Sequence, residues 1–183
     1  MAKRKYLDLI VLLMISAFVI SASAAVYYSL GMTSTIDVAG TDVWFIEGSD
    51  AVVGDCIVTL NEPENTTATI TGLKAYPNIT QTYTDPVELH NNSTSQTYQV
   101  RLNPVSLSGN DTEFVSVKFT LNASAGLRTL EYTCNGTDWT IPSTTNWVTL
   151  GISEDAPILI ETKAKAGAGA GASVAIAIAV DVQ

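Results

Sequence analysis

The stretch Ser173-Val-Ala-Ile-Ala-Ile-Ala-Val-Asp-Val182 alternates branched apolar residues with small or acidic ones over its whole length. Because successive side chains of a strand point to opposite faces, this alternation predicts a β-strand with one packing face. The packing face consists of Val174, Ile176, Ile178, Val180 and Val182. The other face carries mainly alanines, which allow another layer of protein to approach closely.

The segment 166–171, just before this strand, repeats alanine and glycine like a fragment of silk. A silk-like stack needs many repeats and many chains in register, so a repeat this short cannot build one. Residues 157–163 upstream have the composition of another strand, and glycine favours turns. We therefore expect the repeat to be a turn and the two strands to form a closing hairpin.

The same two-residue period recurs along the chain. Apolar and polar residues alternate in segments 56–60, 98–102 and 115–121, and turn-forming residues separate these segments. No segment beyond residue 30 sustains the apolar spacing of a helix. The sequence therefore predicts an all-β domain over residues 39–183, a β-sandwich of the jelly-roll or immunoglobulin-like kind.

The composition excludes several classes of protein. The chain has 183 residues, of which 46% are hydrophobic and 15% charged, and its formal net charge is −9. It is therefore too apolar to be disordered. An acidic surface repels nucleic acid and anionic lipid, so we expect neither as a partner.

The first residues have the three-part form of a secretory signal peptide. Lys3, Arg4 and Lys5 precede an apolar run of residues 9–20, and small residues follow up to Ala24. This pattern predicts cleavage of residues 1–24 and only a transient contact with the membrane during export. A retained membrane anchor is the alternative, although the strongly apolar run is shorter than the ~20 residues that span a bilayer.

The mature N-terminus is expected to be one long strand, residues 25–38. Its period of two is sustained from residue 26 to residue 38, which exceeds the usual strand of about five or six residues. A long apolar edge strand without proline promotes aggregation unless it is paired. Its partner is either its own sheet or, by strand addition, a neighbouring molecule. The donor-strand residues would be Val26, Tyr28, Leu30, Met32, Ile36 and Val38.

Two further features are typical of exported proteins. Cys56 and Cys134 are the only cysteines, and an even pair in an oxidising compartment predicts a disulfide. The sequence also contains many Asn-x-Ser/Thr triplets, which predict covalent N-glycans on an extracellular surface. These triplets begin at Asn65, Asn78, Asn91, Asn92, Asn110, Asn122 and Asn135.

Residues with catalytic or ligand-binding chemistry are sparse. His90 is the only histidine, and it is expected to be a solvated residue of a turn, so we predict neither an enzyme nor a metal site. Glu47, Asp50 and Asp55 match no calcium-binding loop and are expected to be solvated. The glycines of segment 166–171 lack the flanking residues of a phosphate-binding loop, and no cofactor is expected.

The layout resembles the camelysin/TasA family of biofilm-fibre proteins and their archaeal bundling-pilus relatives. The resemblance is carried by the leader, the aromatic start Ala25-Val-Tyr-Tyr-Ser29, the segment Ser34-Thr-Ile-Asp-Val38, and the segments 86–93 and 98–102. It implies a jelly-roll subunit that donates its N-terminal strand to the next subunit of an extracellular filament. By that resemblance the donor role falls on Val26, Tyr28, Leu30 and Met32.

Three functions are consistent with these features. The first is a structural subunit of a cell-surface filament, with copies of itself as partners. The second is a type IV-like pilin that keeps an apolar N-terminal helix. The third is a secreted monomeric module that binds glycans through Trp44, Trp139 or Trp147.

Overall fold

The computed structural model describes residues 30–38, 42–51, 56–61, 63–109, 112–169 and 172–183. The predicted signal peptide, Val26, Tyr28, Asp55 and Asn110 lie outside the described residues. None of the described residues belongs to a helix that could cross a membrane. The strands are β1 (Leu30–Val38), β2 (Val43–Glu47), β3 (Ile57–Leu60), β4 (Thr67–Ala75), β5 (Thr80–Asn91), β6 (Tyr98–Ser108), β7 (Phe114–Ala123), β8 (Gly126–Cys134), β9 (Trp139–Thr140), β10 (Val148–Leu150), β11 (Asp155–Ala164) and β12 (Ser173–Val182).

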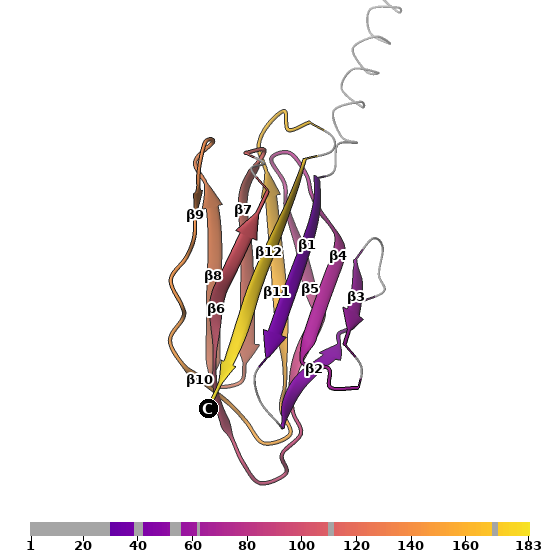
Figure 1. The fold of residues 1–183 in the computed structure, drawn as a ribbon, viewed down its shortest axis with the longest axis vertical. Coiled ribbons are helices and arrows are strands. Elements are labelled where there is room, and N and C mark those ends of the chain that lie inside the picture. The colour runs from indigo at the N-terminus through magenta and orange to yellow at the C-terminus, as the bar shows by residue number, and fades with distance from the viewer. Residues whose placement is uncertain (1–29, 39–41, 52–55, 62, 110–111, 170–171) are drawn as a thin grey trace, which may run out of the picture.

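These strands form two sheets that pack face to face (Figure 1). The first sheet, here sheet A, has the order β10-β6-β12-β1-β4-β3. The second, sheet B, has the order β2-β5-β11-β7-β8-β9. The prediction of an all-β sandwich is therefore confirmed.

The packing face predicted for β12 is also confirmed. Val174, Ile176, Ile178 and Val180 are all buried, and Ala175, on the opposite face, is exposed. Each inward side chain lies in the core because its strand is covered on one face only, by sheet B.

The predicted closing hairpin is wrong. β11 lies in sheet B, where β5 and β7 occupy both of its edges, so it has no edge free for β12. β12 instead pairs with β6 and β1 in sheet A. The Ala-Gly segment thus belongs to a connection between the two sheets, and Ala168 within it is buried.

The interior contains aromatic and branched side chains from both sheets. Phe119 and Tyr132 meet edge to face, with ring centroids 6.2 Å apart, in the geometry that aromatic pairs favour. Burial raises the pKa of the Tyr132 hydroxyl to about 12. The largest fully buried side chains are Tyr132, Phe45, Phe114, Phe119, Met32, Ile36, Ile70, Leu73, Leu89, Leu102 and Leu121.

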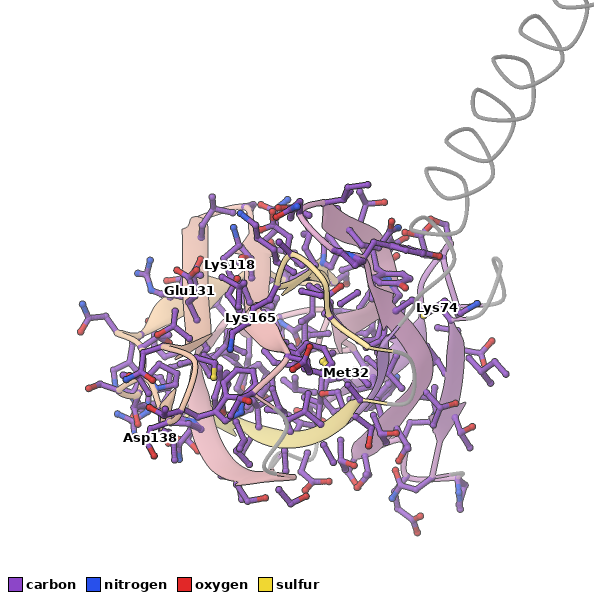
Figure 2. The ribbon with its side chains drawn as sticks, turned by 90° about the horizontal axis from the view of Figure 1, so that it is seen from above. Met32, Lys74, Lys118, Glu131, Asp138 and Lys165 are labelled. Carbon is purple, nitrogen blue, oxygen red and sulfur yellow. The ribbon has the colours of Figure 1, made fainter. Side chains whose placement is uncertain are left out.

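The sandwich has two ends, which we name after the termini of β1. At the Leu30 end lie the last residues of β4, β6, β8 and β11 and the first residues of β5 and β12. Seen from that end, Met32 lies in the interior, whereas Lys74 and Asp138 lie on opposite sides of the molecule (Figure 2). The Val38 end contains the starts of β2 and β6 and the C-terminal Gln183.

Replacement of Ile178 by alanine should lower the free energy of unfolding by about 2–5 kcal/mol, because it leaves a cavity at a fully buried position. Ala177→Ser, one residue earlier on the outward face, should change it by less than about 0.5 kcal/mol. Denaturant unfolding followed by circular dichroism measures both values. Equal effects of the two substitutions would contradict the assigned faces of β12.

Candidate functional site: the seat of strand β1

β1 is a central strand of sheet A. It pairs in parallel with β12 from Gly31↔Ser173 to Val38↔Val180. On its other side it pairs antiparallel with β4, from Leu30↔Ala75 to Asp37↔Thr67. Of the two pairings that the sequence left open, the single chain thus has the one within its own sheet, and residues 30–38 are part of the sandwich.

The side chains of β1 alternate between the core and the outside. Met32, Ser34, Ile36 and Val38 are buried, with exposed fractions of 2%, 0%, 0% and 6%. Thr33 and Asp37 are exposed on the outer face. Full burial of an apolar side chain of this size contributes about 1.5–3 kcal/mol, so β1 is held by its inward face as well as by its two hydrogen-bonded ladders.

A bulge in β4 sets the register of β1. Met32 pairs with Leu73, but Ser34 pairs with Ile70, so two residues of β4 lie opposite Thr33. One of them is Gly72, whose φ of 75° is costly for any residue with a side chain. Such a bulge interrupts the ladder and makes a shift of β1 along β4 unfavourable.

Ser34 is the one polar residue on the inward face of β1. Its hydroxyl oxygen is buried and has no hydrogen-bond partner among the described residues. A buried polar group without a partner destabilises a fold by about 1–3 kcal/mol. Ser34 therefore offsets part of the stabilisation that Met32, Ile36 and Val38 supply.

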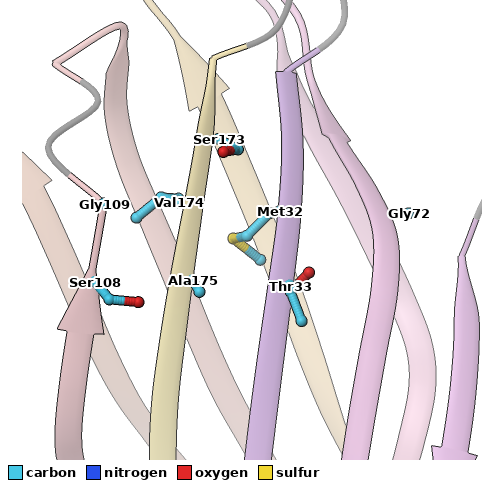
Figure 3. Close-up of a pocket in the computed structure, with 8 residues that line it drawn as sticks. All are labelled: Met32, Thr33, Gly72, Ser108, Gly109, Ser173, Val174 and Ala175. Atoms are coloured by element: carbon cyan, nitrogen blue, oxygen red, sulfur yellow. The ribbon is translucent and has the colours of Figure 1, made fainter.

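A trough runs over the outer face of β12 near the Leu30 end. One cavity of about 430 Å³ is lined by Thr33, Gly72, Ser108, Gly109, Ser173 and Ala175 together with Met32 and Val174 (Figure 3). A second cavity of about 210 Å³ continues along Ser106 and Ala177. The trough exists because the outward side chains of β12 are alanines, and it matches the smooth face expected from the sequence.

The edges of both sheets are short. β10 and β3 border sheet A with 3 and 4 residues, and β2 and β9 border sheet B with 5 and 2 residues. Short edge strands offer few free backbone groups to another chain. Among the described residues, the long ladders of sheet A are those made by β1 and β12 in its centre.

The predicted disulfide between Cys56 and Cys134 is wrong for this fold. Both cysteines are free and buried. Cys56 precedes β3 at one lateral edge of the sandwich, and Cys134 ends β8 near the other edge. Strands lie about 4.8 Å apart, so about 20 Å of sheet separates the two cysteines, whereas a disulfide needs Cα atoms within about 7 Å. Burial and the charge of Asp50 raise the pKa of the Cys56 thiol to about 11, which makes it unreactive.

Asn91 cannot carry a glycan in this fold, so that candidate is wrong. It is fully buried, and its amide donates to the carbonyl oxygens of Gln96 (2.9 Å) and Gly151 (2.6 Å). Its side-chain oxygen accepts a hydrogen bond from the Ser93 amide (2.9 Å). The side chain of Asn91 thus holds the β5–β6 connection together.

The other described glycosylation candidates lie at the two ends of the sandwich. Asn78 and Asn135 are exposed at the Leu30 end, and Asn92 and Asn122 are exposed at the Val38 end. Asn65 is half-buried, and its side-chain oxygen has no partner among the described residues. Sheet A has no candidate asparagine on any strand, so glycans at these positions leave its outer face open.

His90 is not a turn residue, contrary to the expectation from sequence. It lies in β5, where its Nδ1 is 2.5 Å from the Asp155 Oδ1 and its ring centroid is 5.5 Å from that of Trp44. The adjacent asparagines suggested a turn, but β5 extends through the histidine because β2 and β11 pair with it on both sides. In the described parts of the chain, no three His, Cys, Asp or Glu side chains are grouped closely enough to bind a metal ion.

Asp50 stabilises a loop. Its Oδ2 accepts hydrogen bonds from the amides of Asp85 (3.0 Å) and Thr84 (2.8 Å) and from the Thr84 hydroxyl (2.9 Å). These bonds, the one from the Asp85 amide first, lower the pKa of Asp50. Glu47 is exposed at the end of β2.

The three tryptophans do not form one platform. Trp44 lies on β2 at one lateral edge, against His90. Trp139 lies on β9 at the other edge and contacts Phe114, with 6.2 Å between ring centroids. Trp147 is covered by Arg101, whose guanidinium carbon lies 4.4 Å from the ring centroid. The described structure therefore places no pair of these rings side by side for a sugar.

Ser34→Ala should raise the free energy of unfolding by about 1 kcal/mol, because it removes a buried hydroxyl that has no partner. Ser106→Ala, at an exposed position of β6, is the matched control and should have almost no effect. Thermal and denaturant unfolding of the monomer measure both changes. A loss of stability in Ser34→Ala would mean that the hydroxyl has a partner.

Peptide mapping of the protein from its native cells by mass spectrometry should find any N-glycans only at exposed asparagines, such as Asn122 and Asn135. Asn91 should be unmodified, because its amide nitrogen makes two buried hydrogen bonds. A glycan at Asn91 in the folded protein would contradict the structure of the β5–β6 connection.

Comparison with known proteins gives no family assignment. No protein-family model matches the chain, and no curated protein matches it. The resemblance to the camelysin/TasA family therefore rests on the sequence features alone and stays a prediction.

Proposed function

We propose that the protein is a structural subunit of an extracellular filament, such as a pilus or a biofilm-matrix fibre, that polymerises by donor-strand complementation. In this assembly the β1 of one subunit lies between β4 and β12 of the next subunit. We call this position between β4 and β12 the seat of β1. The partners of each subunit are copies of itself, and N-glycans cover the two ends. The protein has no catalytic role in this proposal and needs no cofactor.

The observation that carries the proposal is the position of β1. It is the first strand of the described chain, yet it lies in the middle of sheet A with a ladder on each side. Once the predicted signal peptide of residues 1–24 is removed, β1 lies close to the N-terminus, so it can leave its seat without unthreading the rest of the chain. Its departure opens a groove walled by β4 and β12, which a second copy of the same strand fits.

The edges of the two sheets support the same mode of assembly. Edge strands of 2 to 5 residues give a weak template for pairing between molecules. Exchange of β1 instead reuses two long ladders and the burial of Met32, Ile36 and Val38. The unpartnered hydroxyl of Ser34 weakens the binding of β1 within its own chain and eases its release, and it weakens the pairing with a neighbour equally.

A charge on the inward face of β1 tests the proposal. Ile36→Asp should abolish filaments, because it places a carboxylate at a fully buried position. Thr35→Asp is the matched control on the outward face, where the natural Asp37 is already exposed, and its filaments should persist. Negative-stain electron microscopy and sedimentation measure the amount of polymer.

A peptide separates failure to fold from failure to polymerise. A synthetic peptide of residues 30–38 with the natural sequence should fill the seat of the Ile36→Asp subunit and restore a folded, soluble monomer. That complex should form no filaments, because its only tethered donor strand carries the aspartate. Filaments of natural length from the complemented variant would refute the proposed function.

A further inference from the structure

The connection between β1 and β2 is short, and its two ends lie together. The amide of Val38, at the end of β1, donates to the carbonyl oxygen of Thr66 at 2.8 Å. The amide of Phe45, in β2, donates to the carbonyl oxygen of the neighbouring Asn65 at 2.8 Å. β1 therefore joins the rest of the fold at the Val38 end.

The length of the chain limits where a released β1 can reach. A fully extended chain advances at most about 3.6 Å per residue, so Val38 can move about 18 Å from Val43. β1 itself is about 26 Å long at 3.3 Å per residue. The Val38 terminus of a donated strand therefore stays near the Val38 end of its own subunit, and its Leu30 terminus points away from it.

Donation in the direction seen in the single chain would need two Val38 ends side by side. In that case the donated strand would have Val38 at the Val38 end of the acceptor. The seat is flanked by two strands on one side and three on the other, or about 10–14 Å of sheet. A tether of about 18 Å then reaches a subunit placed edge to edge with its ends level, or a subunit whose Val38 end faces that of the donor. When a two-fold axis relates the two copies, their exchanged strands satisfy each other, and such a closed pair does not grow.

In an open filament of subunits stacked end to end and pointing the same way, the Val38 end of each donor meets the Leu30 end of its acceptor. The Leu30 terminus of the donated strand then lies deep in the acceptor, towards the acceptor's Val38 end. The tethered Val38 terminus of the donated strand lies at the acceptor's Leu30 end. We propose that β1 reverses its direction on donation, so that in the filament it runs antiparallel to the neighbour's β12 and parallel to its β4. This inference rests on the proposed function and specifies how one copy recognises another.

The sequence of β1 allows this reversal. Because side chains alternate between the two faces of a strand, a reversed β1 can keep the same face towards the core. That face carries Met32, Ser34, Ile36 and Val38, and it stays inward when these residues lie beside inward-facing residues of β12. Thr33 and Thr35 stay on the outer face, beside the alanines of β12. In both directions β1 has one parallel and one antiparallel neighbour, so its number of ladder hydrogen bonds is conserved.

Cross-linking between subunits that each carry one added cysteine tests the direction. One subunit carries Thr33→Cys or Thr35→Cys, and the other carries Ala175→Cys, Ala177→Cys or Ala179→Cys. Each variant is first shown to assemble with the natural protein, and then all six pairs are co-assembled and oxidised. Only links between subunits can form in these mixtures. The natural chain is the control and should stay uncross-linked, because Cys56 and Cys134 are buried.

The direction of the donated β1 follows from which β12 cysteine links best to Thr33→Cys and which links best to Thr35→Cys, and it does not depend on the register. For a reversed strand, the partner of Thr33→Cys has a higher residue number than the partner of Thr35→Cys, for example Ala179→Cys and Ala177→Cys. The preferred pairs should give at least tenfold more covalent dimer on a denaturing gel than the other pairs.

Two results would overturn the inference in different ways. Preferred pairs of Thr33→Cys with Ala175→Cys and Thr35→Cys with Ala177→Cys, the register of the single chain, would show donation without reversal and leave the proposed function standing. Filaments without a link for any pair, or no filaments at all, would refute strand donation itself.

Discussion

Everything in sheet A depends on the two ladders of β1. The strand joins β12 on one side to β4 on the other, so without it the sheet would separate into two parts. Its inward side chains close the core between these parts. The first strand of the described chain thus completes a sheet whose other members come from much later in the sequence, and it is attached to them mainly by noncovalent contacts.

In the proposed assembly β1 is both indispensable and replaceable. A strand with the same pattern from another molecule could supply the same hydrogen bonds and the same apolar burial, so the free energies of the two pairings differ little. The buried hydroxyl of Ser34 weakens both pairings alike, so the balance between them depends on the tether that limits the geometry of a donor. A fold of this kind can favour polymer over monomer without any new interface chemistry.

The remaining surface bears on the proposed mode of association at the sheet edges and at the two ends. The edge strands are short, and the central strands β1, β11 and β12 have ladders on both sides, whereas β6 and β8 pair with their edge strands over three and two residues only. The exposed glycosylation candidates lie at the ends, away from the outer face of sheet A. Glycans at the ends would, however, lie near the junction between stacked subunits, where they could affect the spacing along a filament.

The sequence alone determined the class of fold and the faces of many strands. Period-two alternation is a local property, and it placed Val174 and Ile178 in the core and Ala175 outside before any partner was known. For the same reason, the inward face of β1 was recognised at Met32, Ile36 and Val38. The candidate site could thus be named from the sequence as far as the residues of the strand itself.

Tertiary structure decided which strands pair, because pairing joins segments distant in sequence and leaves no local pattern. The hairpin of β11 and β12 failed because both edges of β11 are occupied, and the disulfide failed because the two cysteines lie at opposite lateral edges. The burial of Asn91 likewise depends on Gly151, which lies far away in sequence. The seat of β1, its bulge at Gly72 and its short tether to β2 are long-range features of this kind, and only the folded chain reveals them.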